Sequence, residues 1–225
     1  VHLTNDETDR WLELSLKIRQ EVARAKNGSQ VGPLSDRARR LLFQRARIVK
    51  KARTKVEVAM RVIRDHYDRD QKWIAYCEDG DQLEELAGRL LREGFPVAQY
   101  RTSMEGDPAK TMQWFREATG IIVAIRCLDE GIDIPSVTHA IILASAKNPR
   151  QFIQRRGRVL RKSDGKNFAF LHDLISLPAE DSEDASELFA PLLTTELGRA
   201  SRFAELSFNL SPRSTIRDLK SKFSL

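Results

Sequence analysis

Residues 71–178 alternate between short apolar, β-rich runs and amphipathic segments with helical spacing, and this alternation constrains the fold more than any other feature. The strand-like runs are KWIAYC, PVAQYR, GIIVAIRC, VTHAIILAS and KNFAFLHDLI, and the clearest amphipathic run is DGDQLEELAGRLLREG. Strands that alternate with helices form right-handed crossovers and a mainly parallel sheet covered on both faces. We therefore predict an α/β fold with its functional residues at the carboxyl ends of the strands.

Both flanks of this region are predicted to be helical, so the chain divides into three parts. Residues 1–70 are a helical lead-in, residues 71–178 are the α/β domain, and residues 179–225 are a helical C-terminal extension. The chain opens without an initiator Met, and we expect it to be a piece of a longer polypeptide whose preceding domain is missing.

Two local patterns shape the lead-in. Thr4 and Glu7 have the T-x-x-E spacing of a capping box, in which the two side chains satisfy free N–H groups at a helix start. Apolar residues then recur at helical spacing between 42 and 67, which predicts a single long helix with a basic outer surface.

The charge distribution points weakly to a polyanionic partner. The 225 residues hold 38 Lys+Arg against 32 Asp+Glu, a formal net charge of +6, which many proteins reach without binding nucleic acid. Eleven basic residues and one acid lie between 37 and 64, whereas five acids lie between 180 and 187. The basic stretch is either a duplex-facing surface or a solvated helix that braces neighbouring domains.

Cysteine usage and hydropathy indicate a reducing compartment. Cys77 and Cys127 have no nearby cysteine or histidine partners, which argues against a disulfide scaffold and against a zinc site. No apolar run approaches the length of a membrane span, and no signal peptide is visible. We expect a cytoplasmic protein with no membrane partner and no bound structural metal.

The segment QFIQRRGRVLR, residues 151–161, places arginines at helical intervals. Gln154, Arg158 and Arg161 lie at i, i+4 and i+7, which is one stripe of a helix. Guanidinium groups are planar, permanently charged donors that bind phosphate oxygens in pairs, and Gly157 leaves room for close approach. The alternative is a solvated basic face.

These residues, together with an upstream loop, resemble the C-terminal RecA-like domain of superfamily 2 helicases and translocases. Gln154, Arg155, Gly157, Arg158 and Arg161 match motif VI of that superfamily, Q-R-x-G-R-x-x-R. Within LDEGIDIP, the triplet G-I-D matches the core of motif V, and WIAYCEDGDQLEELAGRL is similar to motif IV and its helix. The string from 130 to 161 looks most like bacterial DEAH-type restriction and DNA-repair helicases.

The resemblance implies an ATP site shared between two RecA-like domains. Arg158 and Arg161 would act as arginine fingers on the γ-phosphate, and Gln154 would lie near the phosphates and the attacking water. Arg155 and Gly157 would complete the motif. Asp133 would lie near the ribose or couple nucleotide to nucleic acid, and Gly131, which allows a tight strand-to-loop turn, belongs to the same cofactor-binding set.

The chain holds only half of such a site. The single Gly-Lys pair, Gly165-Lys166, is not followed by Ser or Thr and lacks the first glycine of a phosphate loop. An Asp-Glu-x-[Asp/His] box is also absent. The phosphate loop and Mg²⁺ ligands for ATP are therefore expected on an N-terminal RecA-like domain of the same polypeptide, and the chain alone is predicted not to hydrolyse ATP.

Nucleic-acid contacts are expected at strand ends, where backbone N–H groups, hydroxyls and arginines bind phosphates without reading sequence. The candidate residues are Asp79, Gly80, Arg101, Thr102, Ser103 and Arg126. Arg126 stands near the position where many superfamily members carry a threonine, which leaves open the kind of nucleic acid bound.

Three functions remain open from the sequence. The first is the C-terminal motor half of an ATP-dependent DNA helicase or translocase, with DNA and restriction or repair subunits as partners. The second is the same engine acting on RNA. The third is a nucleic-acid-binding or partner-binding module without motor activity.

Overall fold

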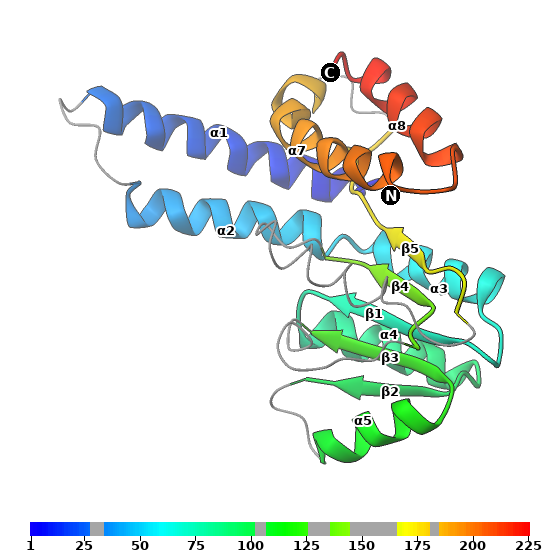
Figure 1. Cartoon of the computed structure of the whole chain (residues 1–225). Helices are drawn as coiled ribbons and strands as arrows, with labels where there is room; N and C mark the ends of the chain where they lie inside the picture. The colour runs from blue at the N-terminus through cyan, green and yellow to red at the C-terminus, as the bar shows by residue number, and fades with distance from the viewer. Residues whose placement is uncertain (28–33, 102–106, 126–135, 145–165, 181–184) are drawn as a thin grey trace. The chain divides into compact units, whose positions relative to one another are not determined.

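The computed structural model describes residues 1–27, 34–101, 107–125, 136–144, 166–180 and 185–225 (Figure 1). The chain forms two compact units, which are described separately. A helical unit comprises Val1–Thr54 with Ile175–Leu225, and a sheet unit comprises Lys55–Leu174. Over the described ranges, no helix combines the length and the apolar composition that crossing a bilayer requires.

The sheet unit contains a parallel sheet of five strands in the order β2-β3-β1-β4-β5. The strands are β1 (Lys72–Cys77), β2 (Val97–Tyr100), β3 (Gly120–Ile125), β4 (His139–Ile142) and β5 (Phe170–Asp173). Every neighbouring pair runs parallel. The central strands are buried almost throughout, as expected for a sheet covered on both sides, so the predicted α/β fold with a mainly parallel sheet is confirmed.

Helices cover both faces of this sheet. Lys72 donates a hydrogen bond from Nζ to the carbonyl of Phe115 (2.8 Å), in helix α5 (Pro108–Glu117). The next residue along β1 is Trp73, and its ring centroid lies 5.7 Å from that of His172. The His172 ring in turn stacks on His66 of helix α3 (Thr54–His66). Because successive strand residues point to opposite faces, α5 and α3 cover opposite sides.

Helix α4 (Gly80–Arg92) lies against β1, β2 and β3 and is tied to α3 by charged side chains. Arg64 binds Glu93 through two nitrogens, and Arg89 bridges Glu57 and Glu85. These pairs are largely exposed and contribute little to stability, so the apolar face of α4 carries the packing.

The helical unit is built from α1 (Asn5–Asn27), α2 (Asp36–Lys50), α7 (Ala185–Glu205) and α8 (Ser211–Lys222). Helices α1 and α2 run side by side as a hairpin, and α7 packs on α1 (Figure 1). The rings of Trp11 and Phe189 stack with their centroids 3.8 Å apart at the centre of this core.

Backbone hydrogen bonds join the two chain segments that form the helical unit, Val1–Thr54 and Ile175–Leu225. The N–H of Leu3 donates to the carbonyl of Leu177 (2.9 Å), and the N–H of Leu177 donates to the carbonyl of Val1 (2.8 Å). The predicted capping box is confirmed beside this pairing. The N–H of Thr4 donates to Glu7 Oε2 (3.0 Å), and the N–H of Glu7 donates to Thr4 Oγ1 (3.3 Å).

The single long helix expected over 42–67 is wrong, because the chain breaks between α2 and α3. Ala52 is buried in the break, the N–H of Arg53 donates to Glu7 Oε1 (3.0 Å), and the hydroxyl of Thr54 donates to the carbonyl of His2 (2.7 Å). These tertiary contacts satisfy the backbone at the break. These tertiary hydrogen bonds outweigh the local preference for a continuous helix, which the unbroken spacing of apolar residues in the sequence had indicated.

A row of rings crosses the sheet near the amino ends of its strands. Trp73 and His139 are register partners that stack at 4.1 Å, and His139 stacks on its own partner Phe170 at 4.5 Å. Burial, with a smaller contribution from neighbouring imidazoles, lowers the pKa of both His139 and His172 to about 4. Both imidazoles are therefore neutral at pH 7.

These two histidines make stability fall in mild acid. Between pH 6.5 and about 4, the unfolded chain binds protons on both imidazoles that the folded chain does not, so the free energy of unfolding decreases as pH falls through that window. We expect a lower urea midpoint at the acid end of the window than at neutral pH. His172→Leu should reduce the difference, because it removes one of the two imidazoles whose pKa is lowered. Equal pH dependence in wild type and His172→Leu would contradict this assignment.

Candidate functional site

Parallel strands all end on one edge of the sheet, and this edge holds the described candidate residues. Strand β1 leads into Glu78 and Asp79, β2 leads into Arg101, and β4 leads into Leu143 and Ala144. In sheets of this kind, ligands bind outside the carboxyl ends of the strands. The described part of the edge therefore lies where a functional site is expected.

The loop between β1 and α4 is held by a capping arrangement. Asp79 is the N-cap of α4, and its Oδ1 accepts a hydrogen bond from the N–H of Gln82 (3.3 Å). Gln82 is buried, and its Oε1 accepts from the N–H of Glu78 (2.9 Å). Asp79, predicted as a nucleic-acid contact, thus has a structural role in this loop. Gln82 was missed, although the D-x-x-Q spacing is a recognisable capping pattern.

Arg101 and Gly80 meet at this edge. Arg101 donates from Nη1 to Glu84 Oε1 (2.9 Å), and a Cβ added to Gly80 would lie 3.3 Å from the same nitrogen. Gly80 therefore leaves room for the guanidinium at the first turn of α4, where backbone N–H groups and the helix dipole attract anions. Within the described residues, Nε of Arg101 is buried and has no hydrogen-bond partner.

The end of β4 is fixed from two sides. The N–H groups of Leu143 and Ala144 both approach the carbonyl of Tyr76, at 3.0 Å and 3.4 Å. Lys55, at the start of α3, is buried and donates from Nζ to the carbonyl of Leu143. The sequence did not single out Lys55, because it lies in a run of basic residues that reads as a solvated surface.

Two further observations limit the chemistry of this edge. Cys77 is buried at the end of β1, and burial raises the pKa of its thiol, so it is not a reactive thiolate at neutral pH. Across the described ranges, no group of three His, Cys, Asp or Glu side chains is placed to hold a metal ion. Besides the carboxylates of Asp79 and Glu84, the described edge offers the Arg101 guanidinium and the N–H groups at the start of α4, and these donors suit phosphate.

The remaining candidate residues lie outside the described residues. They are Gln154, Arg155, Gly157, Arg158, Arg161, Gly131, Asp133, Thr102, Ser103 and Arg126. The structure brings Asp79, Gly80 and Arg101 together, and the functional roles assigned to all of the candidate residues stay predictions.

The family comparison agrees with the fold. Residues 54–163 match the family described as the helicase conserved C-terminal domain. The matched stretch starts at α3, contains β1 to β4, and includes the QRRGRVLR segment.

Proteins similar to this chain include a translocase and a putative helicase. The chain is 28% identical over 180 residues to the DNA 3'-5' translocase XPB2 of Sulfurisphaera tokodaii, covering 73% of this chain and 39% of that protein. It is 26% identical over 112 residues to the putative ATP-dependent RNA helicase MJ1505 of Methanocaldococcus jannaschii, covering 46% of this chain and 14% of that protein. The chain thus spans well under half the length of either relative.

A solved structure shares the fold. The SWI2/SNF2 ATPase core of Sulfolobus solfataricus, in complex with dsDNA, superposes with a TM-score of 0.60 at 16% identity, covering 79% of this chain and 40% of that one. At this identity the likeness concerns the fold, and it supports the RecA-like α/β assignment. The narrower resemblance to DEAH-type restriction and repair helicases stays a prediction.

Replacing Gln82 tests whether the capping arrangement holds the candidate edge. Gln82→Leu removes the acceptor for the part-buried N–H of Glu78, and the loss of one such hydrogen bond costs about 0.5–1.5 kcal/mol. We expect urea unfolding to show a loss of that size. Gln113→Leu, the same change at an exposed position of α5, should stay within about 0.5 kcal/mol of wild type. Equal effects of the two substitutions would show that the loop does not depend on Gln82.

Proposed function

We propose that this chain, which carries a helicase conserved C-terminal domain at residues 54–163, is the C-terminal motor half of an ATP-dependent DNA helicase or translocase. The observation that carries the proposal is the coincidence of a parallel RecA-like sheet with the QRRGRVLR segment inside the matched residues. DNA is favoured over RNA because the relative named as a DNA translocase aligns with 73% of this chain, against 46% for the relative named as an RNA helicase.

The chemistry of the residues fits one side of a nucleotide site. Gln154, Arg158 and Arg161 supply amide and guanidinium donors, which bind phosphate oxygens, and no phosphate loop accompanies them in the sequence. ATP with Mg²⁺, held mainly by an N-terminal RecA-like domain of the same polypeptide, would supply the phosphate bond that is broken. The chain's part is to present positive charge to that phosphate from the opposite side.

Each motif residue then has a distinct role. Arg158 and Arg161 stabilise negative charge on the γ-phosphate, and a finger of this kind contributes about 10³–10⁵ in rate. Gln154 lies near the phosphates and the attacking water, Arg155 holds the motifs together, and Gly157 leaves room for close approach. In the upstream loop, Gly131 provides the turn and Asp133 carries a carboxylate toward the ribose or the nucleic-acid side.

The nucleic-acid track would run along the carboxyl edge of the sheet. Arg101, seated over Gly80 at the start of α4, would contact backbone phosphate together with Thr102, Ser103 and Arg126. Asp79 contributes by fixing the loop. Such contacts are independent of base sequence, as a translocating motor requires.

Two alternative functions make different demands on these arginines. The C-terminal half of an RNA helicase would use the same arginines, and the similarity to a putative RNA helicase supports this alternative. A binding module without motor activity would not need Arg158 or Arg161. Restriction or repair subunits are further proposed partners, on the strength of the DEAH-type resemblance alone.

The experiment is nucleic-acid-stimulated ATP hydrolysis by the full-length polypeptide that contains this chain. We expect duplex DNA to stimulate turnover, Arg158→Ala to lower it by about 10³-fold or more, and the isolated chain to show none. Arg116→Ala, an exposed arginine of α5, is the matched control and should retain wild-type activity.

Full activity of Arg158→Ala would show that this arginine is not a finger. Turnover by the isolated chain would show that the ATP site is complete without a second domain. Stimulation by RNA and not by DNA would favour the RNA helicase alternative.

A further inference from the structure

A cleft lies at the amino edge of the sheet, which is the edge away from the arrowheads of the strands (Figure 1). It has a volume of about 640 Å³ and is open to solvent. Strands β2 and β3 begin beside it, and helices α3, α4 and α5 end beside it, so the whole cleft belongs to the sheet unit. Its lining includes Tyr67, Arg69, Pro96, Trp114, Glu117 and Thr119.

Two aromatic rings form fixed walls of this cleft. The ring of Tyr67 packs edge-on against that of Phe95, with the centroids 5.5 Å apart. The ring of Trp114 lies against the start of β3, where a Cβ added to Gly120 would come within 2.9 Å of Trp114 Cη2. Gly120 also has a φ of +145°, which glycine adopts readily. Because the rings are already held in place, a ligand does not have to order them.

The cleft also holds polar groups that have no partner. The hydroxyl of Tyr67 is buried, and it makes no hydrogen bond to any residue that the structure describes. The indole N–H of Trp114 and the hydroxyl of Thr119 likewise have no partner among the described residues. By contrast, the indole N–H of Trp73 donates to Gln71 Oε1 (2.7 Å). A buried hydroxyl without a partner is unfavourable, and a ligand carbonyl in the cleft would supply the missing acceptor.

This combination of groups matches the chemistry of a proline-rich segment. Such a segment forms an extended polyproline II helix, and it binds in grooves lined by aromatic side chains. Proline has no N–H, so its carbonyl is an acceptor that needs a donor from the binding site. The cleft supplies both aromatic rings for the proline rings and unpaired donors for the carbonyls.

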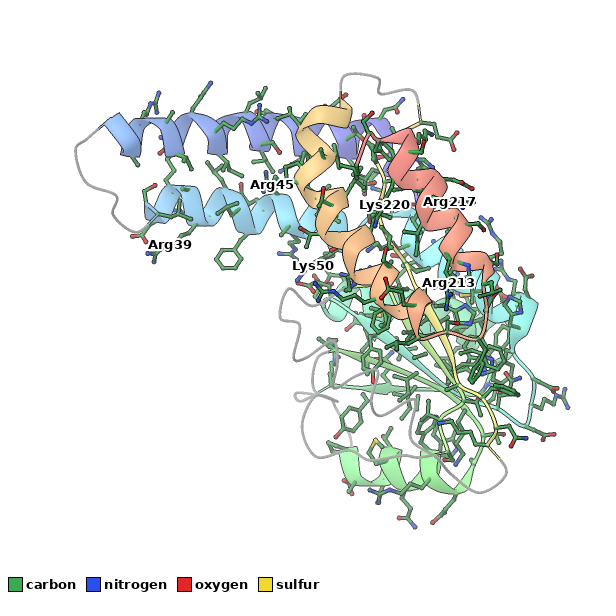
Figure 2. The ribbon with its side chains drawn as sticks, turned by 45° about the horizontal axis from the view of Figure 1, so that its top comes forward. Arg39, Arg45, Lys50, Arg213, Arg217 and Lys220 are labelled. Carbon is green, nitrogen blue, oxygen red and sulfur yellow. The ribbon has the colours of Figure 1, made fainter. Side chains whose placement is uncertain are left out.

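A nucleic acid fits the cleft less well, because the charges around it are mixed. Arg69 lines the cleft, but Glu117 lines it too, and Asp68 and Asp70 flank Arg69 in the sequence. A phosphate chain would therefore meet charges of both signs. The basic side chains labelled in Figure 2 belong to α2 and α8 of the helical unit, outside the cleft.

We propose that the cleft at the amino edge binds a proline-rich segment of a partner protein in the polyproline II conformation. The 225 residues carry no such segment, because their eight prolines are scattered. The closest two along the sequence, Pro96 and Pro108, lie in the cleft wall and in α5. The proposal does not rest on the proposed motor function, and binding at this edge leaves the carboxyl edge of the sheet free.

The test is titration of the 225-residue chain with a peptide of about ten prolines, followed by tryptophan fluorescence. The chain has three tryptophans; Trp11 and Trp73 are buried, whereas Trp114 is half-buried, so a change in emission reports on the cleft. We expect a saturable blue shift as proline rings cover Trp114, and no shift with a Gly-Ser peptide of the same length. Trp114→Phe should abolish the shift.

Tyr67→Phe keeps the ring and removes only the hydroxyl. We expect it to weaken binding of the proline peptide about three- to tenfold, because one carbonyl loses its donor. The stability of the free chain should not fall, because the hydroxyl has no partner within the described residues. The matched control is Tyr100→Phe, the same change at the carboxyl end of β2, which should bind the peptide as tightly as wild type.

Four outcomes would overturn the proposal. The first is no shift with the proline peptide, and the second is an equal shift with the Gly-Ser peptide. The third is an affinity that Tyr67→Phe leaves unchanged or that Tyr100→Phe lowers equally. The fourth is a shift with single-stranded oligothymidine and not with the proline peptide, which would make the cleft a stacking site for bases.

Discussion

The parallel pairing of β1 on both sides is the constraint on which the rest of the sheet unit depends. β1 lies between β3 and β4, and its residues are register partners of both. Because all strands run in one direction, their carboxyl ends lie at one edge of the sheet. Asp79, Arg101 and Leu143 therefore lie at the same edge, although they are far apart in the sequence. The hydrogen bonds of Gln82 and Lys55 then fix the loops that leave this edge.

The helical unit uses two arginines of α2 in its packing. Arg45 lies over the Trp11 ring and donates to Ser15 Oγ, and Arg37 pairs with Glu21. The hairpin of α1 and α2 is therefore held by the stems and charges of arginine side chains as well as by apolar contacts.

The sequence predicted the fold well because the signals involved are local and periodic. Alternating runs gave the parallel sheet, and T-x-x-E gave the capping box at Thr4. The sequence-based prediction was wrong or incomplete where contacts between residues far apart in the sequence determine the structure. The break before α3 depends on partners at the N-terminus, and the burial of Lys55 depends on a strand end 88 residues away. For Asp79 the hydrogen bond accepted from the N–H of Gln82 shows a capping role that the sequence analysis missed, and its nucleic-acid contact stays a prediction. The motif V and VI residues lie outside the described residues, so their roles rest on chemistry and family likeness.

In the proposed function, Arg158 stabilises the transition state of phosphate transfer in a site completed by another domain. The most direct measurement is the affinity of the full-length polypeptide for ADP with aluminium fluoride, relative to ADP alone, in wild type and in Arg158→Lys. We expect wild type to bind the transition-state analogue more tightly than ADP, and we expect Arg158→Lys to lose most of this preference, because lysine lacks the paired donors of a guanidinium. An unchanged preference in Arg158→Lys would contradict this role.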